Sequence, residues 1–403
     1  MSRLAILAAF GLLCLGDPGE AWKPKLLNIQ ALWRHGDRVP VGTYPTDPHQ
    51  EDAWPMPWGE LTTKGMWQHY RQGLKIQQEY VHNLQFLNAT YSVKDVYVRS
   101  SDTTRTLLSA QSNMAGLYST SKGTFPENKA WPGTWTPVPV HTVSKDEDLV
   151  RTTNTTLQQI PLLDSVPRTT LSQADRAPGQ PTKRACISEF PQQKQGRSPE
   201  QISQSAKIQV TNFMDLYTFA NTLAIEKAHG MELPEWITDD LYRQVVEVAD
   251  PGFDYLYGGA AFGFPENVEM VSLSGGVLMK EIIENMQKRI GGKSQIKYHA
   301  FSGHDITVAG LLRTLGAKTK ILGSEHADYA AVVVIELWET GSFDFAVRVR
   351  YSANTETPFE TITPLVEGCP TEEFCPLPTF ITKRLNYLPL DLKEQCKSRK
   401  TMV

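Results

Sequence analysis

Arginine and histidine side chains gather in LWRHGDRVP, residues 32–40, directly after an apolar run. Arg34, His35 and Arg38 lie within five residues, and like charges this close repel one another unless an anion lies between them. Arginine offers forked N–H donors that match the oxygens of a phosphate group. The residue types therefore indicate a site for a dianionic tetrahedral group, with a histidine that either holds the group or attacks it.

The same arrangement, an apolar segment followed by a polar cluster and a helix-compatible stretch, occurs twice more. Residues 94–118 contribute Arg105, and residues 296–316 contribute His304 and Asp305. Strands that lead into helices are typical of an α/β domain, in which ligands bind beyond the carboxyl ends of the strands. We therefore expect the three clusters to converge at one edge of the sheet.

Each of these residues also has a plain structural interpretation. A single arginine is most often a solvated surface charge, and a single histidine is often a hydrogen-bonded cap. Asp305 or Ser302 would cap the helix that follows, as Ser101 or Asp102 would cap the earlier one. Because three strand ends carry the same chemistry, a shared anion site is the better interpretation.

The three motifs resemble those of a known family. RHGDRVP is similar to the RHGxRxP signature of the histidine acid phosphatases, a branch of the histidine phosphatase superfamily, RSSDTTRT to their second arginine motif, and SGHD to their distal HD motif. Similarity extends over nearly the whole chain beyond its amino terminus, through TYPTDP, GELTTKGMWQHY, PVPVHTV, SGGVLMKEI and EGCPTEEFCPL.

This resemblance implies a role for each residue in an acid phosphatase of broad specificity for phosphate monoesters. His35 would be the nucleophile that forms a phosphohistidine, and Asp305 would protonate the leaving oxygen and then help to activate water. A neutral histidine nitrogen attacks only if an acceptor holds its other nitrogen, and the carbonyl of Gly36 or a nearby one is expected to do so. The phosphoryl oxygens would be held by Arg34, Arg38, Arg105 and His304. Since the arginines supply positive charge, no metal ion or other cofactor is expected.

Other functions remain open at this level. A specialised phosphatase, such as a phytase or a lysophosphatidate phosphatase, would differ only in the rim and in inserted segments. A catalytically silent secreted binder on the same fold would be signalled by loss of His35 or Asp305, and both are present. A phosphoglycerate mutase is disfavoured, because that branch is cytosolic and does not pair its second histidine with such an aspartate.

The amino terminus has the composition of a signal peptide. Arg3 precedes a short apolar stretch, so residues 1–21 are expected to be removed, with cleavage after Gly16 or Ala21. No second apolar run of spanning length follows, which predicts a soluble protein of the secretory pathway, secreted or in the lysosomal lumen, without a stable membrane anchor. The net charge of −4 gives no reason to expect nucleic acid as a partner; a homodimer is implied by the resemblance alone.

Cysteines and glycosylation sequons agree with this location. Beyond the signal peptide, four cysteines allow two disulfides in three connectivities. A turn could join Cys369 to Cys375, which would leave Cys186 with Cys396; a metal site is disfavoured because no histidine accompanies them at ligand spacing. The asparagines at 88 and 154 begin sequons.

The chain should fold as an α/β protein with an insertion. We expect a mixed, mostly parallel sheet flanked by helices, built from residues 22–145 and 266–403, and a mostly helical cap over 146–265. Stretches 205–230, 237–248 and 273–292 read as helices. Alternating residues in 329–339 and 343–353 predict a hairpin at the edge of the sheet.

Overall fold

The computed structural model describes residues 23–144, 148, 199–210 and 213–389. The expected signal peptide, Asn154, Cys186 and Cys396 lie outside these residues. Within the described ranges, no helix is long and apolar enough to cross a membrane.

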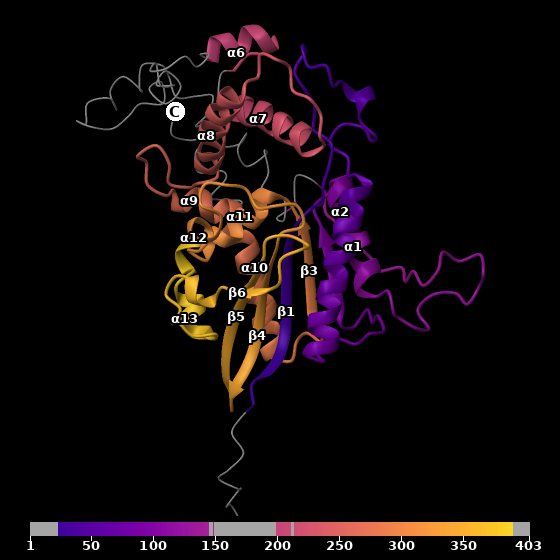
Figure 1. Cartoon of the computed structure of the whole chain (residues 1–403). Coiled ribbons are helices and arrows are strands. Elements are labelled where there is room, and N and C mark those ends of the chain that lie inside the picture. Colours follow the sequence, from indigo (N-terminus) through magenta and orange to yellow (C-terminus); the bar gives the residue numbers. More distant parts are fainter. Residues whose placement is uncertain (1–22, 145–147, 149–198, 211–212, 390–403) are drawn as a thin grey trace, which may run out of the picture.

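A mixed β-sheet forms the centre of the molecule (Figure 1). Its strand order is β2 (Val96–Ser100), β3 (Tyr298–Gly303), β1 (Lys25–Arg34), β4 (Val332–Gly341), β5 (Asp344–Ser352) and β6 (Glu360–Thr361), and β7 (Cys375–Pro376) also pairs with β5. The mixed sheet flanked by helices is confirmed. The expectation that it is mostly parallel holds only for β1, β2 and β3, because β4, β5, β6 and β7 all pair antiparallel.

The predicted hairpin is formed by β4 and β5. Its two strands pair along most of their length, from Val332 opposite Ser352 to Gly341 opposite Asp344. The hairpin does not end the sheet, since the two-residue strands β6 and β7 both pair with β5. The chain enters β4 from the carboxyl edge of the parallel strands and turns back at once, which requires antiparallel pairing.

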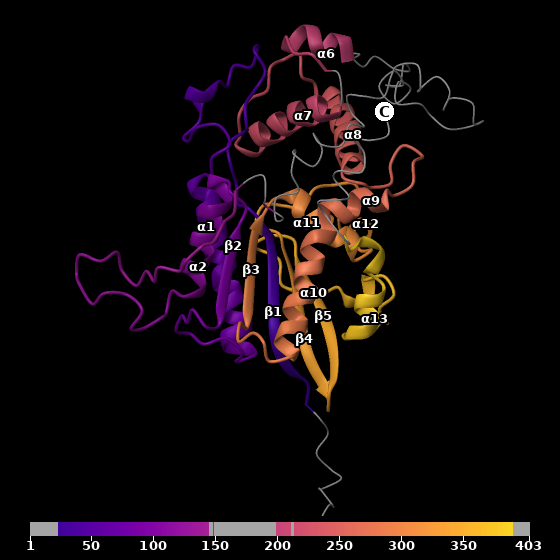
Figure 2. The ribbon, with the colours of Figure 1, turned by 180° about the vertical axis from the view of Figure 1, so that it is seen from behind.

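Helices cover both faces of the sheet (Figures 1 and 2). On one face lie α1 (Thr63–Gln77) and α2 (Thr104–Leu117), and on the other α10 (Val277–Ile290) and α11 (Asp305–Thr314). Along β1, Ile29 and Trp33 pack in the core beside α1 and α2, whereas Leu32 packs in the core beside α10 and α11. A strand buried on both faces is apolar on both, which explains the runs of hydrophobic residues in β1 and β4.

Three further helices, α6 (Pro199–Ala206), α7 (Phe213–Ala228) and α8 (Asp239–Leu256), stand beyond the carboxyl ends of the parallel strands (Figures 1 and 2). We call them the cap helices. The helix expected over 205–230 is shorter, since α7 begins at Phe213 and α6 has ended at Ala206. The remaining short elements are η1 (Glu51–Ala53), η2 (Gln78–Asn83), α9 (Val268–Val271), η3 (Ser272–Gly276), α12 (Lys318–Leu322), η4 (Thr363–Leu365), α13 (Leu377–Thr382) and η5 (Leu385–Tyr387).

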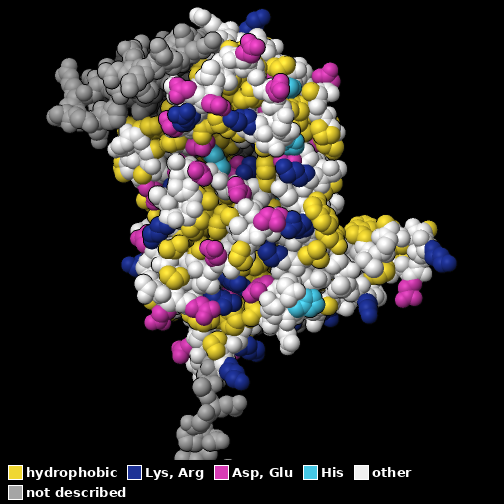
Figure 3. Space-filling view, in the orientation of Figure 1, with side chains coloured by type: hydrophobic (Ala, Val, Ile, Leu, Met, Phe, Trp, Pro, Cys, Tyr) yellow, Lys and Arg dark blue, Asp and Glu magenta, His cyan; other side chains and the backbone are white. Residues whose placement is uncertain are grey.

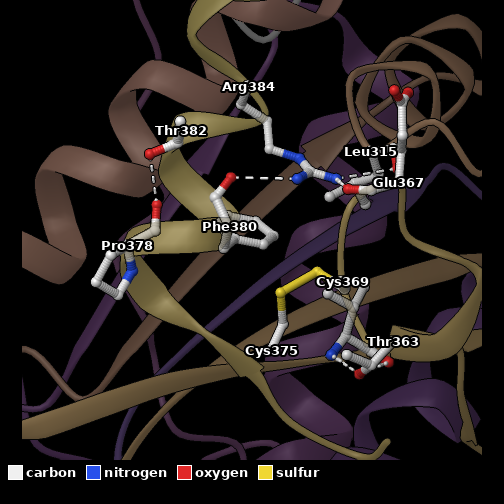
Figure 4. Close-up of a disulfide and its surroundings, with 10 residues drawn as sticks. Leu315, Thr363, Glu367, Cys369, Cys375, Pro378, Phe380, Thr382 and Arg384 are labelled. Carbon is white, nitrogen blue, oxygen red and sulfur yellow. Dashed lines mark hydrogen bonds between the residues drawn. A yellow bond between two sulfur atoms is a disulfide. The ribbon is translucent and has the colours of Figure 1, made fainter. Parts of the chain in front are cut away.

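The segment after β6 contains a local disulfide and one buried arginine that links it to the end of α11 (Figure 4). Cys369 and Cys375 form a disulfide, with their Cα atoms 5.2 Å apart. The buried guanidinium of Arg384 donates hydrogen bonds to the carbonyls of Phe380, Leu315 and Glu367. This segment thereby holds the end of α11, the helix that begins at one of the polar clusters.

Candidate active site

The three polar clusters meet at the carboxyl edge of the parallel strands, as the sequence predicts. Arg34 ends β1, Asp305 begins α11 directly after β3, and Arg105 lies in the first turn of α2 after β2. The rings of His35 and His304 lie 5.5 Å apart in an edge-to-face arrangement. Arg34 Nη2 lies 3.3 Å from Asp305 Oδ2. Residues far apart in the chain therefore form one compact, largely buried group.

His35 is held in the orientation that a nucleophile requires. Its Nδ1 lies 2.9 Å from the carbonyl oxygen of Gly36, which can only accept, so Nδ1 carries the proton and Nε2 keeps its lone pair. Position 36 must be glycine, because a Cβ there would lie 2.3 Å from the carbonyl oxygen of Gly65 at the start of α1. The backbone of the turn after β1 therefore packs directly against the backbone at the start of α1.

Burial and surrounding cations keep His35 neutral. Burial has the largest effect on the pKa of His35, and the positive charges of Arg105 and Arg34, followed by those of His304 and Arg38, lower it further, to well below 6.5. Burial and these charges therefore favour the neutral imidazole, in which Nε2 keeps its lone pair.

The arginine side chains are oriented by neighbouring carbonyls and by the cap. Arg38 donates from Nη1 to the carbonyl of Val39 at 2.9 Å and from Nη2 to Asn221 Oδ1 at 2.8 Å. Arg105 donates to the carbonyl of Gly59 at 3.4 Å, while burial and then Arg38 lower its pKa to about 10, which leaves it charged at physiological pH. The Nε atoms of Arg34, Arg38 and Arg105 are buried without a hydrogen-bond partner among the described residues.

The cluster of positive charge favours an anionic ligand. Among the ion pairs of the described residues, Arg34 pairs with Asp305 while Arg38 and Arg105 have no carboxylate, so an oxyanion would offset their charge. On the face shown in Figure 3, acidic and basic side chains are interspersed without a broad patch of one sign. Among the described residues, no group of three or more His, Cys, Asp or Glu side chains is placed to hold a metal ion. The positive charge is concentrated inside the site.

Asp305 is ionised in this site. Burial acts to raise its pKa, but the positive charges of Arg34, His326 and His304 and the N–H of Ile306, 2.8 Å from Oδ1, outweigh burial and lower it below the usual value of 3.8. An aspartate that donates a proton must first receive one. Asp305 can therefore donate a proton only after it has received one.

The helix caps differ from those expected. The N-cap of α11 is His304 rather than Ser302 or Asp305, and Asp305 is the first helical residue. The N-cap of α2 is Thr103 rather than Ser101 or Asp102. The hydroxyl of Ser101 lies instead 2.9 Å from His304 Nε2, so it orients that ring within the site.

The sequence analysis missed His69 as a supporting residue. Its Nε2 donates to the carbonyl of Arg34 at 3.0 Å, and burial lowers its pKa to about 3, so the ring is neutral. One turn further along α1, Gln72 donates to the carbonyl of Ala330. Both side chains are fully buried. The sequence did hold a signal for these two residues, since both are polar side chains on the inner face of an amphipathic helix. Buried polar groups usually have a specific partner.

Helix α7 and His229, the residue that follows it, hold the loop after His35. Thr222 Oγ1 donates to the carbonyl of Gly42 at 3.0 Å, and His229 Nε2 lies 3.1 Å from Asp37 Oδ1. Beside this loop, Trp54 is buried with Val39 and with Ile225 of α7. The cap helices thus hold the loop that follows His35 as well as covering it.

The buried carboxyl group of Glu226 should make the stability of the folded protein depend on pH. It is fully buried beside Asp47. Burial and then the neighbouring Asp47 raise its pKa to about 9. The folded chain therefore keeps a proton that the unfolded chain releases near its ordinary pKa, so stability falls as the pH rises between these values. We expect Glu226→Gln to raise the melting temperature at pH 8 and to leave it nearly unchanged at pH 4.

Thermal unfolding at the two pH values measures this effect. Glu247→Gln changes an exposed glutamate of α8 and serves as the matched control. A melting temperature that Glu226→Gln leaves unchanged or lowers at pH 8 would contradict the expected ionisation.

Known proteins share both the sequence and the fold. A family model described as histidine phosphatase superfamily (branch 2) matches residues 25–352. The lysosomal acid phosphatase of Homo sapiens is 31% identical over 374 residues, 92% of this chain and 79% of that protein. The prostatic acid phosphatase of Mus musculus is 32% identical over 391 residues, covering 94% and 92%. A phytase from Citrobacter braakii has a TM-score of 0.56 at 17% identity, covering 92% and 99%, which shows a common fold.

Proposed function

This chain belongs to branch 2 of the histidine phosphatase superfamily, and from that premise we propose that His35 is the nucleophile and Asp305 the proton donor. The chain is an acid phosphatase that hydrolyses phosphate monoesters through a phosphohistidine intermediate. The residue roles rest above all on one observation, a neutral His35 whose Nδ1 is held by a carbonyl. The phosphoryl group would be bound by Arg34, Arg38, Arg105 and His304.

The reaction has two steps. In the first, His35 Nε2 attacks phosphorus, the bond from phosphorus to the ester oxygen breaks, and Asp305 gives its proton to the departing alcohol. In the second, Asp305 takes a proton from water as that water attacks phosphorus, the N–P bond breaks, and inorganic phosphate leaves. The arginines offset the charge on the phosphoryl oxygens in both steps.

The proton that Asp305 needs can arrive with the substrate. A phosphate monoester binds its last proton with a pKa of about 6, so it enters as a monoanion in acid solution. The monoanionic ester and the ionised Asp305 share one proton, which can lie on either group. The bound phosphate offsets the positive charge of Arg34 that keeps Asp305 ionised. The proton can therefore pass from the ester to Asp305. Activity should therefore fall as the pH rises through the second ionisation of the substrate.

We also propose the domain division and a broad specificity. Residues 22–145 and 266–403 would form the phosphatase core and residues 146–265 the cap, which is supported by the contacts of α7 with the loop after His35. The site residues described above would all contact the phosphoryl group and not the alcohol of the ester. This favours small phosphate esters of varied alcohols. The homodimer implied by the resemblance stays a prediction.

Hydrolysis of p-nitrophenyl phosphate by the purified protein between pH 4 and pH 8 tests the proposed function. We expect turnover to be highest on the acid side. A wild-type chain that releases no phosphate from this ester at any of these pH values would overturn it.

We propose that the protein passes through the secretory pathway to the lysosome or the extracellular space. The relatives include lysosomal and prostatic acid phosphatases, and the side chain of Asn88 is exposed, as glycosylation requires. On expression of the full chain in a eukaryotic cell, endoglycosidase treatment should increase the electrophoretic mobility of the protein. The Asn88→Gln variant should run faster than wild type before treatment. Protein found only in the cytosol, with no such shift, would contradict this location.

A further inference from the structure

Tyr329 lies in the loop between α12 and β4 and packs against Arg34. The Cζ atom of Arg34 lies over the ring of Tyr329, 4.2 Å from its centroid. The rings of Tyr329 and His35 have their centroids 5.9 Å apart, at an angle of 44°. Tyr329 is partly exposed, whereas Arg34 and His35 are both buried. One aromatic ring therefore lies against an arginine of the proposed phosphate site and beside the proposed nucleophile.

The backbone beside this ring is fixed by hydrogen bonds that do not involve it. The N–H of Arg34 donates to the carbonyl of Ala331 at 3.0 Å, and the N–H of Ala330 donates to the carbonyl of His35 at 3.2 Å. The carbonyl of Ala330 accepts a hydrogen bond from the side chain of Gln72. Ala330 has a φ of 59°, a left-handed conformation that a residue other than glycine keeps only where its surroundings enforce it. Removal of the ring should therefore leave the loop and the end of β1 in place.

The other contacts of the Arg34 guanidinium leave it free to tilt. Its Nη1 donates to the carbonyl of Ala327 at 2.5 Å, and its Nη2 lies 3.3 Å from Asp305 Oδ2. These two contacts hold the two terminal nitrogens, so the planar group can still rotate about the line that joins them. An arginine can lay its face on an aromatic ring while its edge donates hydrogen bonds. The ring of Tyr329 therefore supplies the third contact that fixes the direction of the remaining N–H donors.

An aromatic ring suits this task because it holds a cation without cancelling its charge. The ring attracts the guanidinium through the negative potential of its face, whereas a second carboxylate beside Asp305 would repel the phosphate as well. The attraction is stronger where water is excluded, and Arg34 is buried. The contact can therefore orient Arg34 and still leave its positive charge to the bound anion.

We propose that Tyr329 is a positioning residue, whose ring holds the guanidinium of Arg34 in the orientation that binds the phosphoryl group. Tyr329 acts through Arg34 and not on the reacting atoms. This inference rests on the proposed function only in taking Arg34 as a phosphate ligand. Because Arg34 would hold the phosphoryl group both before and during the reaction, loss of the ring should weaken binding more than it slows the chemical step.

The test uses Tyr329→Leu, which removes the ring, and Tyr329→Phe, which keeps it, in the full chain. The dissociation constant of inorganic phosphate is measured by calorimetry at pH 5, with kcat and KM for p-nitrophenyl phosphate at the same pH. Tyr329→Leu should raise the dissociation constant and KM about tenfold, the size expected for a largely desolvated cation–π contact, and should change kcat by less than about threefold. Tyr329→Phe should match wild type within about twofold in all three constants.

Two further variants show where the ring acts. Tyr242→Leu removes a ring that lies under a cation outside the site, 4.5 Å from Lys227 Nζ, and should leave phosphate binding unchanged. Arg34→Ala combined with Tyr329→Leu should bind phosphate as weakly as Arg34→Ala alone, because the ring then has no guanidinium to hold. A phosphorus NMR titration measures these weaker complexes.

Four results would overturn the inference. The first is a Tyr329→Leu variant that binds phosphate as tightly as wild type, and the second is an equal loss in Tyr329→Phe, which assigns the effect to the hydroxyl. The third is a further loss of affinity when Tyr329→Leu is added to Arg34→Ala, and the fourth is a loss confined to kcat. Tyr329→Met gives the same test if Tyr329→Leu does not fold. A wild-type protein that binds phosphate but hydrolyses no ester would refute the proposed function and leave this inference standing.

Discussion

Replacing His35 with alanine is expected to lower kcat for p-nitrophenyl phosphate at pH 5 by at least about 10⁴-fold, since loss of a nucleophile removes the covalent route altogether. The side chain is buried, its Nδ1 is held by the carbonyl of Gly36, and its lowered pKa keeps Nε2 unprotonated. The Nε2 atoms of the two neighbouring histidines are engaged, since that of His304 lies 2.9 Å from Ser101 Oγ and that of His69 donates to the carbonyl of Arg34.

A second measurement separates the nucleophile from a residue that only binds. Wild-type protein mixed with radiolabelled ester and quenched in base should retain label, because a phosphoramidate bond survives base, whereas His35→Ala should retain none. His141→Ala is the matched control, since His141 stacks on Tyr97 outside the site and its loss should leave both readouts unchanged. If His35→Ala hydrolysed the ester as fast as wild type, the proposed mechanism would be wrong.

The convergence of the site could be predicted from the sequence because strand direction alone determines it. Three segments with the same order of strand, polar cluster and helix place their clusters at one edge whenever the strands are parallel, and β1, β2 and β3 are parallel. The acceptor for His35 was also predictable, since the turn after β1 leaves few carbonyls within reach and that of Gly36 is adjacent.

The residues that hold the site could not be predicted, because they come from segments whose placement no local pattern fixes. Asn221 reaches Arg38 from a cap helix 183 residues away in the chain, and His326 reaches Asp250 from a loop without periodicity. The ionisation of Asp305 likewise depends on summed charges and burial. The sequence suggests an acid that must be protonated to act, and only the pairing with Arg34 shows that the pKa of this carboxyl is lowered in the folded chain.

Replacing Asp305 with asparagine should have opposite effects on chemistry and on binding. Asparagine has nearly the same shape but cannot give a proton to the leaving oxygen, and general acid catalysis typically contributes about 10² to 10⁴-fold. The loss of kcat should therefore be about 10³-fold for glycerol phosphate, whose alkoxide leaves poorly, and nearer tenfold for p-nitrophenyl phosphate. Removing the negative charge beside Arg34 should at the same time tighten the binding of inorganic phosphate.

Kinetics with both esters and calorimetry with phosphate measure these effects on one preparation. Asp328→Asn changes an exposed carboxylate on the loop between α12 and β4 and should leave the ratio of the two esters as in wild type. Equal losses of kcat for the two esters would argue against an acid role for Asp305, since a residue that only orients Arg34 cannot distinguish between leaving groups. Tighter phosphate binding together with unequal losses of kcat for the two esters would assign two roles to Asp305. Its ionised carboxylate repels the phosphate, and its protonated form donates to the leaving oxygen.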